Sequence, residues 1–287
     1  MHLSAPIPIR HDLAPLARLE TNWVAPWLIA RIAQHGPWHF GNGAPMDDSH
    51  IIGGTAGAFW MAAADGVGSQ PLSRHGSSAA CLALDTYVGA MLTKGAIPSR
   101  KLLLEAFDAA HAAIQDLASR DNNPAHLYAT TLAAVLIKGN TIVGAAIGDS
   151  GIAVATAHED ELGNQAFALT PFCSAPQPGN ATFTIADPNW LNYVASNETH
   201  SPHISSVIVA TDGANNFFLS PSQAGSAFHT DWPAALEGRL QALGPLTFVN
   251  TFAHFIQHQP PENHDDRTLL VAYKAPPGLA PPAQKSG

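Results

Sequence analysis

Three aspartates in this chain follow short apolar runs, and each is followed by a small residue. Asp65 ends the stretch AFWMAAAD, Asp212 ends SSVIVATD, and Asp149 lies in GAAIGDSGI. A further pair, Asp265 and Asp266, directly precedes the apolar run RTLLVAY. Carboxylates at the ends of neighbouring strands can converge at one edge of a sheet, where their repulsion is costly unless a cation lies between them. The pattern therefore predicts a metal site.

The donor atoms of this predicted site are hard oxygens. Neither cysteine, Cys81 or Cys173, belongs to a Cys-x-x-Cys pair. Oxygen donors favour Mg²⁺ or Mn²⁺ over Zn²⁺. Gly66 and Gly213 each follow an aspartate, and a residue without a Cβ lets the backbone approach an ion and present its carbonyl. Two such ions about 3.5–4 Å apart could activate a bridging water and clamp a phosphoryl group.

The tetrapeptide GDSG at residues 148–151 allows a second interpretation, in which Ser150 is the nucleophile of a serine hydrolase. Such an enzyme needs a histidine and an aspartate that converge on the serine, and secretion and disulfides usually accompany this motif. With two cysteines and no continuous apolar segment near residue 1, the chain offers neither. We therefore expect Ser150 to be a turn residue and Asp149 to be the functional one.

Histidine-based zinc binding is another alternative, because the chain has 15 histidines. His254 and His258 have the i, i+4 spacing of a helical metal pair. The segment between them reads FIQ, without the acidic residue of the metalloprotease motif. We expect these two histidines to lie on an ordinary helix surface.

The overall composition narrows the class of protein. The 287 residues include 22 acidic and 13 basic ones, for a net charge of −9. The sequence has no stripe of Lys and Arg residues that could bind the phosphate backbone of a nucleic acid, so we expect no nucleic-acid partner. No apolar run approaches the roughly 20 residues that a membrane span needs. We expect a soluble, cytoplasmic protein that binds no membrane.

Local patterns predict an α+β fold. Residues 130–156 consist of apolar runs separated by KGN and GDSG, which predicts an antiparallel meander with GDSG between two strands. Further strands are expected over 204–213 and 267–273, and helices over 77–92, 101–118, 233–243 and 248–258, with Ser99 as an N-cap. Strands and helices occur in blocks, which favours antiparallel sheets with helices packed outside. We expect one domain over 1–274 and a disordered tail over 275–287.

Five stretches occur in one order between residues 45 and 273, namely PMDDSH, AAADGVGS, IGDSG, VIVATDG and HDDRTLLVAY. Together they resemble the bacterial form of the metal-dependent serine/threonine phosphatases of type 2C. The resemblance implies a four-layer α-β-β-α sandwich with a dinuclear metal site at one end. It also implies direct attack of a metal-bridging hydroxide on phosphoserine or phosphothreonine in proteins, opposing a serine/threonine kinase.

The resemblance assigns the two main ions to four residues. Asp65 would bridge both ions and hold the attacking hydroxide, and the carbonyl of Gly66 would bind one ion. Asp212 and Asp265 would complete the protein ligands of the second ion. Asparagine usually fills the place of Asp266, which we therefore expect just outside the ligand set.

Other acidic residues receive outer roles from the same resemblance. Asp47 and Asp48 would bind the metals largely through water. Asp149 would bind a third, weaker ion, whose second ligand in the family is replaced here by Asn216. A neutral ligand should weaken that third site further.

The chain departs from the family's pattern around the substrate. Gly43 stands where animal members have a phosphate-binding arginine, so His39 or Arg74 becomes the candidate phosphate contact. Val67 stands where some members have a histidine proposed to protonate the leaving group. These departures keep open a second hypothesis, a catalytically weak or inactive phosphatase-like module that regulates or binds phosphoproteins.

Overall fold

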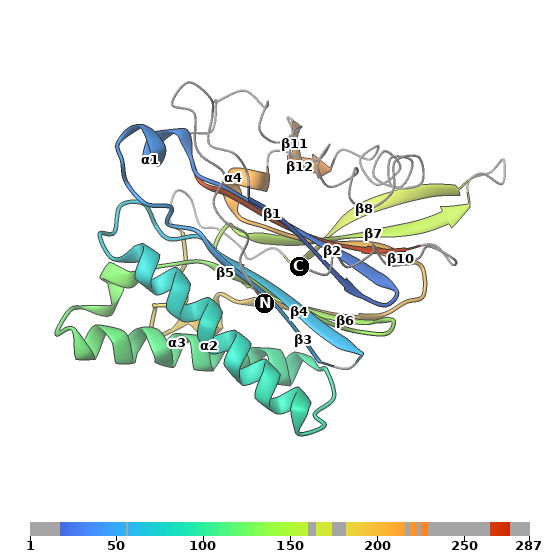
Figure 1. Cartoon of the computed structure of the whole chain (residues 1–287), viewed down its shortest axis with the longest axis horizontal. Helices are drawn as coiled ribbons and strands as arrows, with labels where there is room; N and C mark the ends of the chain where they lie inside the picture. The colour runs from blue at the N-terminus through green and yellow to red at the C-terminus, as the bar shows by residue number, and fades with distance from the viewer. Residues whose placement is uncertain are drawn as a thin grey trace, which may run out of the picture.

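Two antiparallel sheets pack face to face in the computed structural model of this chain (Figure 1). The structure describes residues 18–55, 57–159, 165–173, 182–215, 219–222, 225–228 and 265–275. Figure 1 shows two long helices, α2 (Ser73–Thr93) and α3 (Arg100–Arg120), side by side against the outer face of one sheet. The expected class, an α+β sandwich of antiparallel sheets flanked by helices, is confirmed.

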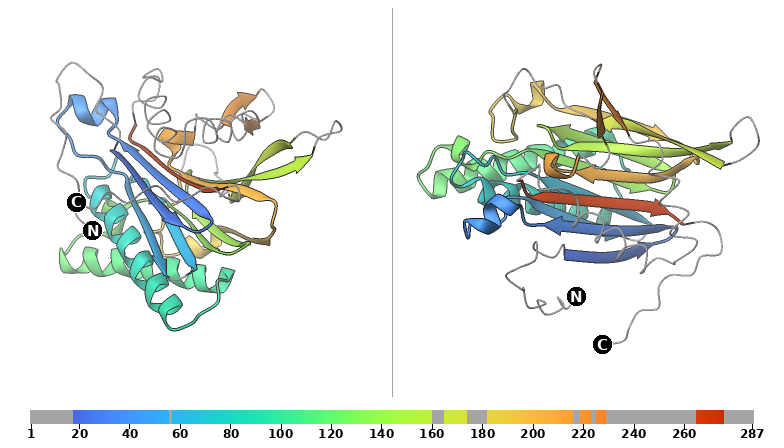
Figure 2. Two further views of the ribbon diagram at one scale, coloured as in Figure 1. Left: turned by 45° about the vertical axis from the view of Figure 1, so that its right-hand side comes forward. Right: turned by 90° about the horizontal axis from the view of Figure 1, so that it is seen from above.

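The first sheet has six strands and the second has five. The six-stranded sheet has the order β1 (Arg18–Val24), β2 (Trp27–Gln34), β13 (Arg267–Lys274), β10 (Ile204–Ala210), β7 (Gly151–Glu159) and β8 (Gln165–Cys173). The five-stranded sheet has the order β3 (Ser49–Thr55), β4 (Ala58–Ala64), β5 (Leu132–Lys138), β6 (Thr141–Ile147) and β9 (Ala195–His200). Figure 2 shows β13 (red) beside the blue strands from the start of the chain, with β10 (orange) on its other side.

The remaining elements are short. They are the helices α1 (Pro37–Gly41), α4 (Asp212–Asn215), η1 (Ala125–Tyr128) and η2 (Trp190–Asn192), and the paired strands β11 (Leu219–Ser222) and β12 (Gly225–Phe228). The helices expected at 233–243 and 248–258, the pair His254 and His258, and residues 276–287 of the expected tail lie outside the described residues. Within the described part of the chain, no helix is long and apolar enough to cross a membrane.

Strand β4 is an interior strand of the five-stranded sheet, between β3 and β5. All seven of its residues are buried, because one face packs on the helices and the other on the six-stranded sheet. Trp60 belongs to the cluster under α2 and α3, whereas Phe59 and Met61 belong to the cluster between the sheets. Burial of a large apolar side chain contributes about 1.5–3 kcal/mol. The strand that ends just before Asp65 is thus rigidly held.

Helix α3 begins where the sequence predicts. The side chain of Ser99 accepts a hydrogen bond from the backbone N–H of Leu102 at 3.2 Å, as an N-cap does. The apolar face of this helix is buried against the sheet and includes Leu103, Phe107, Ala110 and Ile114. Local signals were sufficient for this element.

The predicted three-stranded meander over residues 130–156 is wrong in one respect. Strands β5 and β6 form a hairpin in the five-stranded sheet, but β7 pairs with β10 and β8 in the other sheet. The GDSG turn therefore carries the chain from one layer to the other. Gly148 adopts a positive φ of 89°, and a Cβ there would lie 2.4 Å from the Thr131 side chain, so only glycine suits this crossing.

Candidate metal centre

Strand pairing brings four acidic segments to one end of the sandwich. Strands β4 and β6 both pair antiparallel with β5, so they run parallel to each other and end at the same edge. In the facing sheet, Ala210 at the end of β10 pairs with Gly151 at the start of β7 and with Leu269 near the start of β13. The residues that follow β4, β6 and β10, and those that precede β13, consequently meet.

Three carboxylates come closest together at this edge. Asp65, Asp149 and Asp212 each offer a carboxylate oxygen, and these atoms lie within 4.8 Å of one another. Asp65 follows β4, Asp149 lies between β6 and β7, and Asp212 begins α4. Asp149, to which the resemblance gives only an outer role, thus lies in the same group as the two central aspartates.

Burial and mutual repulsion raise the pKa values of these acids. The pKa of Asp65 lies well above its usual 3.8, because the carboxyl is buried and because Asp48, Asp212 and Asp265 place negative charges near it. Burial, followed by the charges of Asp265 and Asp149, raises the pKa of Asp212 to about 6. A bound cation would reverse this penalty by favouring the charged forms.

The donor set fits hard divalent cations. Among the described residues, Asp212 Oδ1 and Asp48 Oδ1 are buried without a hydrogen-bond partner. A buried polar atom without a partner calls for an unseen ion or water. Convergent carboxylate oxygens are the donors that Mg²⁺ and Mn²⁺ prefer. The residues present therefore suit the metals that the sequence predicts.

Two threonines that sequence reasoning missed hold Asp65 by its backbone. The N–H of Asp65 donates to Thr131 Oγ1 at 2.9 Å, and its carbonyl accepts from Thr130 Oγ1 at 2.8 Å and from the N–H of Thr131 at 2.9 Å. Gly66 lies close to the segment before β3, where a Cβ would lie 2.8 Å from the carbonyl oxygen of Asp47. The pair TT at the start of the β5 segment was the available sequence signal.

Hydroxyl groups also orient the outer carboxylates. Asp48 is 8% exposed, and its Oδ2 accepts from Thr211 Oγ1 at 2.9 Å, which itself accepts from the backbone N–H of Thr268. Burial is the main reason that the pKa of Asp48 lies well above 3.8. Asp149 Oδ2 accepts from Thr182 Oγ1 at 2.9 Å. Each of these contacts restrains one oxygen of its carboxylate.

Asp265 lies beside the central group at the start of the β13 segment. One of its oxygens, Oδ1, accepts a hydrogen bond from the N–H of Asp266 at 2.9 Å. Burial raises the pKa of Asp265, and the charges of Asp266 and Asp149 raise it further. Asp265 acts in turn on the pKa values of Asp65 and Asp212, so it shares their electrostatic environment.

Asp47 and the two candidate phosphate contacts lie at one side of this centre. His39 is 5% exposed, with Nε2 3.5 Å from Asp47 Oδ2 and Nδ1 3.0 Å from Asp266 Oδ2. Arg74 is exposed in the first turn of α2, and its charge acts on Asp47. Burial is the main cause of the raised pKa of Asp47.

Ser150 lies in the interior and not in an accessible position. Its side chain is part of a residue that is 1% exposed, and its Oγ lies 2.7 Å from Thr131 Oγ1. Thr131 in turn accepts from the N–H of Asp65, so the serine supports the backbone of the metal centre. This position favours the structural reading of GDSG over a nucleophilic serine.

Comparisons with known proteins found one family model that matches this chain and several solved structures with a similar fold. The family described as protein phosphatase 2C matches residues 35–244. The structure of RsbX in complex with magnesium is similar with a TM-score of 0.51 and 12% identity, and covers 90% of this chain and 100% of that one. The structure of serine/threonine phosphatase Stp1 from Staphylococcus aureus is similar with a TM-score of 0.58 and 12% identity. The match covers 94% of this chain and 100% of Stp1. The structure of serine-threonine phosphatase 2C from Toxoplasma gondii is similar with a TM-score of 0.56 and 13% identity. The match covers 93% of this chain and 99% of the Toxoplasma chain. No curated protein sequence matches the chain.

Proposed function

Because the chain belongs to the protein phosphatase 2C family, we propose that it is a Mg²⁺- or Mn²⁺-dependent phosphatase that hydrolyses phosphoserine and phosphothreonine in proteins. The observation that carries this proposal is the group of buried carboxylates, three of which lie within 4.8 Å of one another. Their raised pKa values mark a site that is electrostatically incomplete without cations. Both cysteines are free and buried, which suits a cytoplasmic enzyme that opposes a serine/threonine kinase.

Two cations, with a weaker third, fit the carboxylates at this edge of the sandwich. Asp65, the carbonyl of Gly66, Asp212 and Asp265 are the proposed direct ligands of the first two. Asp149 is the proposed ligand of the third, and the outer positions belong to Asp47 and Asp48. When bound, such cations lower the pKa of a shared water and polarise the phosphoryl oxygens.

The chain's own groups orient the reaction. Thr130 and Thr131 hold the backbone of Asp65, so its carboxylate stays directed at the centre. Arg74 is exposed beside Asp47 and is the residue that we propose for the substrate phosphate, because both ring nitrogens of His39 face carboxylates. Val67 has no proton to give, so the leaving group takes its proton from water or from another histidine.

The decisive assay is hydrolysis of matched phosphoserine, phosphothreonine and phosphotyrosine peptides with and without Mn²⁺. We expect metal-dependent turnover of the first two, and loss of at least about 100-fold in Asp65→Ala and Asp212→Asn, the scale of one preorganised electrostatic group. The matched control is Asp116→Asn, which removes an exposed carboxylate of α3. Turnover no greater than in the two site variants would refute the enzymatic proposal.

Arg74→Ala tests the phosphate contact. We expect KM to rise about 10-fold with little change in kcat, because binding of the phosphate in the ground state is lost. Arg120→Ala, at the end of α3, removes an arginine of the same chain as the control. Unchanged KM in Arg74→Ala would remove this residue from the site.

One observation favours a second candidate function, a phosphoprotein-binding regulatory module. Gly43, at the position of the family's arginine, is exposed and has a φ of 66°, a conformation that arginine rarely adopts. A module of this kind would bind phosphopeptides without turnover. Calorimetry with a phosphopeptide, combined with the turnover assay above, separates the two functions.

A further inference from the structure

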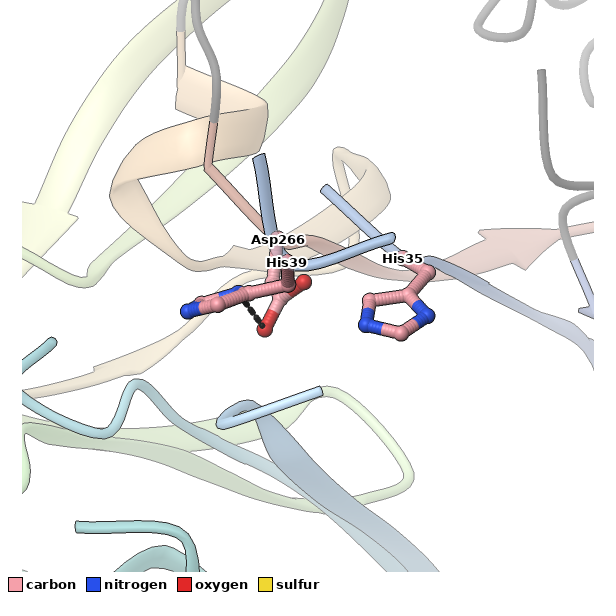
Figure 3. Close-up of side chains that lie close together, drawn as sticks. All are labelled: His35, His39 and Asp266. Carbon is pink, nitrogen blue, oxygen red and sulfur yellow. Dashed lines mark ion pairs between the residues drawn. The ribbon is translucent and has the colours of Figure 1, made fainter. Parts of the chain in front are cut away.

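A second group of potential metal ligands lies outside the carboxylate centre. His35 follows β2, His39 lies in α1, and Asp266 precedes β13 (Figure 3). One ligand atom of each lies within 4.8 Å of the other two. This group offers two imidazole nitrogens and one carboxylate oxygen, whereas the centre described above offers only oxygens. The two groups therefore suit different cations.

Both carboxylate oxygens of Asp266 accept hydrogen bonds from the backbone. The residue is 1% exposed, its Oδ1 accepts from the N–H of Gly36 at 2.6 Å, and its Oδ2 accepts from the N–H of Asp47 at 2.6 Å. A Cβ on Gly36 would lie 2.5 Å from the carbonyl carbon of Asp265, so the close approach of these backbones requires glycine. Metal-binding carboxylates are characteristically fixed by such outer hydrogen bonds.

His39 shows the outer contact that is typical of a metal-binding histidine. Its Nδ1 lies 3.0 Å from Asp266 Oδ2, and its Nε2 lies on the other side, 3.5 Å from Asp47 Oδ2. Metal-binding histidines almost always direct their second ring nitrogen to a carboxylate, a carbonyl or water. Nδ1 is thus the nitrogen that faces the candidate site, and Nε2 is the one that Asp47 orients.

His35 completes the group. Its Nε2 is buried and has no hydrogen-bond partner in the described part of the chain. Figure 3 shows a ring nitrogen of His35 turned toward Asp266. The His35 ring meets Phe40 edge-on, with centroids 6.0 Å apart, and lies 6.2 Å from the ring of His39. A buried nitrogen without a partner, aimed at a carboxylate and a second imidazole, calls for an unseen ion or water at this point.

We propose that His35, His39 and Asp266 bind a late first-row divalent cation such as Zn²⁺. In a tetrahedral zinc site with bonds of about 2.0–2.1 Å, ligand atoms lie about 3.3–3.4 Å apart. The separation of 3.0 Å between His39 Nδ1 and Asp266 Oδ2 is already close to this value. A change in the His35 side-chain torsions would close the remaining distance, and water would fill the fourth position.

A cation at this site would join the end of β2, the helix α1 and the start of β13. Imidazole nitrogens favour Zn²⁺ over Mg²⁺, because Mg²⁺ prefers oxygen ligands such as those of the carboxylate centre. The site is also linked to the carboxylate centre, because His39 lies between Asp266 and Asp47. The proposal does not depend on phosphatase activity.

Calorimetry on the full chain tests the proposal. The protein is stripped of metals, placed in excess Mg²⁺ to fill the oxygen-only centre, and titrated with Zn²⁺. We expect one Zn²⁺ per chain, and an affinity at least about 10-fold lower in His35→Ala and His35→Gln, because even the loss of an outer partner costs a metal site about 10–100-fold. Co²⁺ in place of Zn²⁺ should give the visible absorption bands of imidazole ligation.

Two control variants separate this site from other histidines and from the carboxylate centre. His75→Ala removes an exposed histidine of α2 and should leave Zn²⁺ binding unchanged. Asp65→Asn damages the carboxylate centre and should also leave it unchanged. Equal Zn²⁺ affinity in the wild type and both His35 variants, or loss of Zn²⁺ in Asp65→Asn alone, would overturn the proposal. The turnover assay has no part in this readout, so the two proposals fail separately.

Discussion

Replacement of Asp212 by asparagine should stabilise the metal-free protein at neutral pH. Burial, with the charges of Asp265 and Asp149 nearby, raises the pKa of Asp212 from 3.8 to about 6. Such a shift makes the ionised carboxylate about 3 kcal/mol less favourable in the folded protein than in the unfolded chain. Asparagine has the same shape and no charge, so the variant avoids this cost.

The stabilisation should depend on pH with a defined sign. The unfolded chain loses the Asp212 proton near pH 3.8, whereas the folded protein keeps it until about pH 6. Between these values the folded state binds more protons, so the free energy of unfolding of the wild type falls as the pH rises. The advantage of Asp212→Asn should therefore be near zero below about pH 4 and about 3 kcal/mol above about pH 7.

Urea unfolding of the chelator-treated protein, followed by tryptophan fluorescence from pH 4 to pH 7.5, measures this difference. Addition of Mn²⁺ at about 100 times its Kd should stabilise the wild type by about 2.7 kcal/mol and the variant by much less. Asp116→Asn, on the exposed face of α3, is the control for a generic change of charge. A variant less stable than the wild type at pH 7.5 without metal, or an advantage that does not change with pH, would refute the reasoning.

Three further substitutions test individual contacts. Ser150→Ala should retain Mn²⁺-dependent turnover. Its free energy of unfolding in urea should fall by about 1–3 kcal/mol, because the buried Thr131 hydroxyl loses a hydrogen-bond partner. Abolished turnover would instead make Ser150 catalytic. Gly66→Ala places a Cβ 2.8 Å from the Asp47 carbonyl oxygen, so it should cost about 1–3 kcal/mol of stability. It should also weaken Mn²⁺ binding in calorimetry, and unchanged binding would contradict the close approach of Gly66 to Asp47. Ser99→Ala should lower the free energy of unfolding by about 1 kcal/mol, because α3 loses its N-cap, and should leave kcat unchanged. A lower kcat in a fully folded variant would show that α3 influences the metal centre.

Local sequence signals were sufficient for the two long helices, α2 and α3, and for some of the strands, namely β5, β6, β7, β10 and β13. The N-cap at Ser99 and the 3.6-residue spacing of apolar residues located α3, because both depend on neighbours a few residues apart. Helix α2 begins at Ser73, four residues before the expected range 77–92. No side chain caps its first turn, so no N-cap signal marked the true start. The strand expected over 204–213 ends at Ala210, because Asp212 already begins α4.

The pairing of strands was beyond local signals. The apolar runs around GDSG identified three strands, but the same runs suit either sheet, because β5, β6 and β7 are all largely buried. Which sheet β7 joins is decided by its pairing with β10, about 50 residues further along the chain. The sequence showed the turn, and the tertiary structure decided that it crosses between layers.

The sequence by itself determined which residue types could bind a cation, because acidic residues at strand ends are visible as a pattern. The tertiary structure alone decided which of them meet: Asp149 joins Asp65 and Asp212, whereas Asp47 turns toward His39. It also placed Asp266 against Gly36, 230 positions apart in the chain, and so brought a carboxylate to the two histidines at positions 35 and 39. The physical reason is that a site of this kind is formed by contacts between strand ends, and the order of strands in a sheet is set by long-range packing.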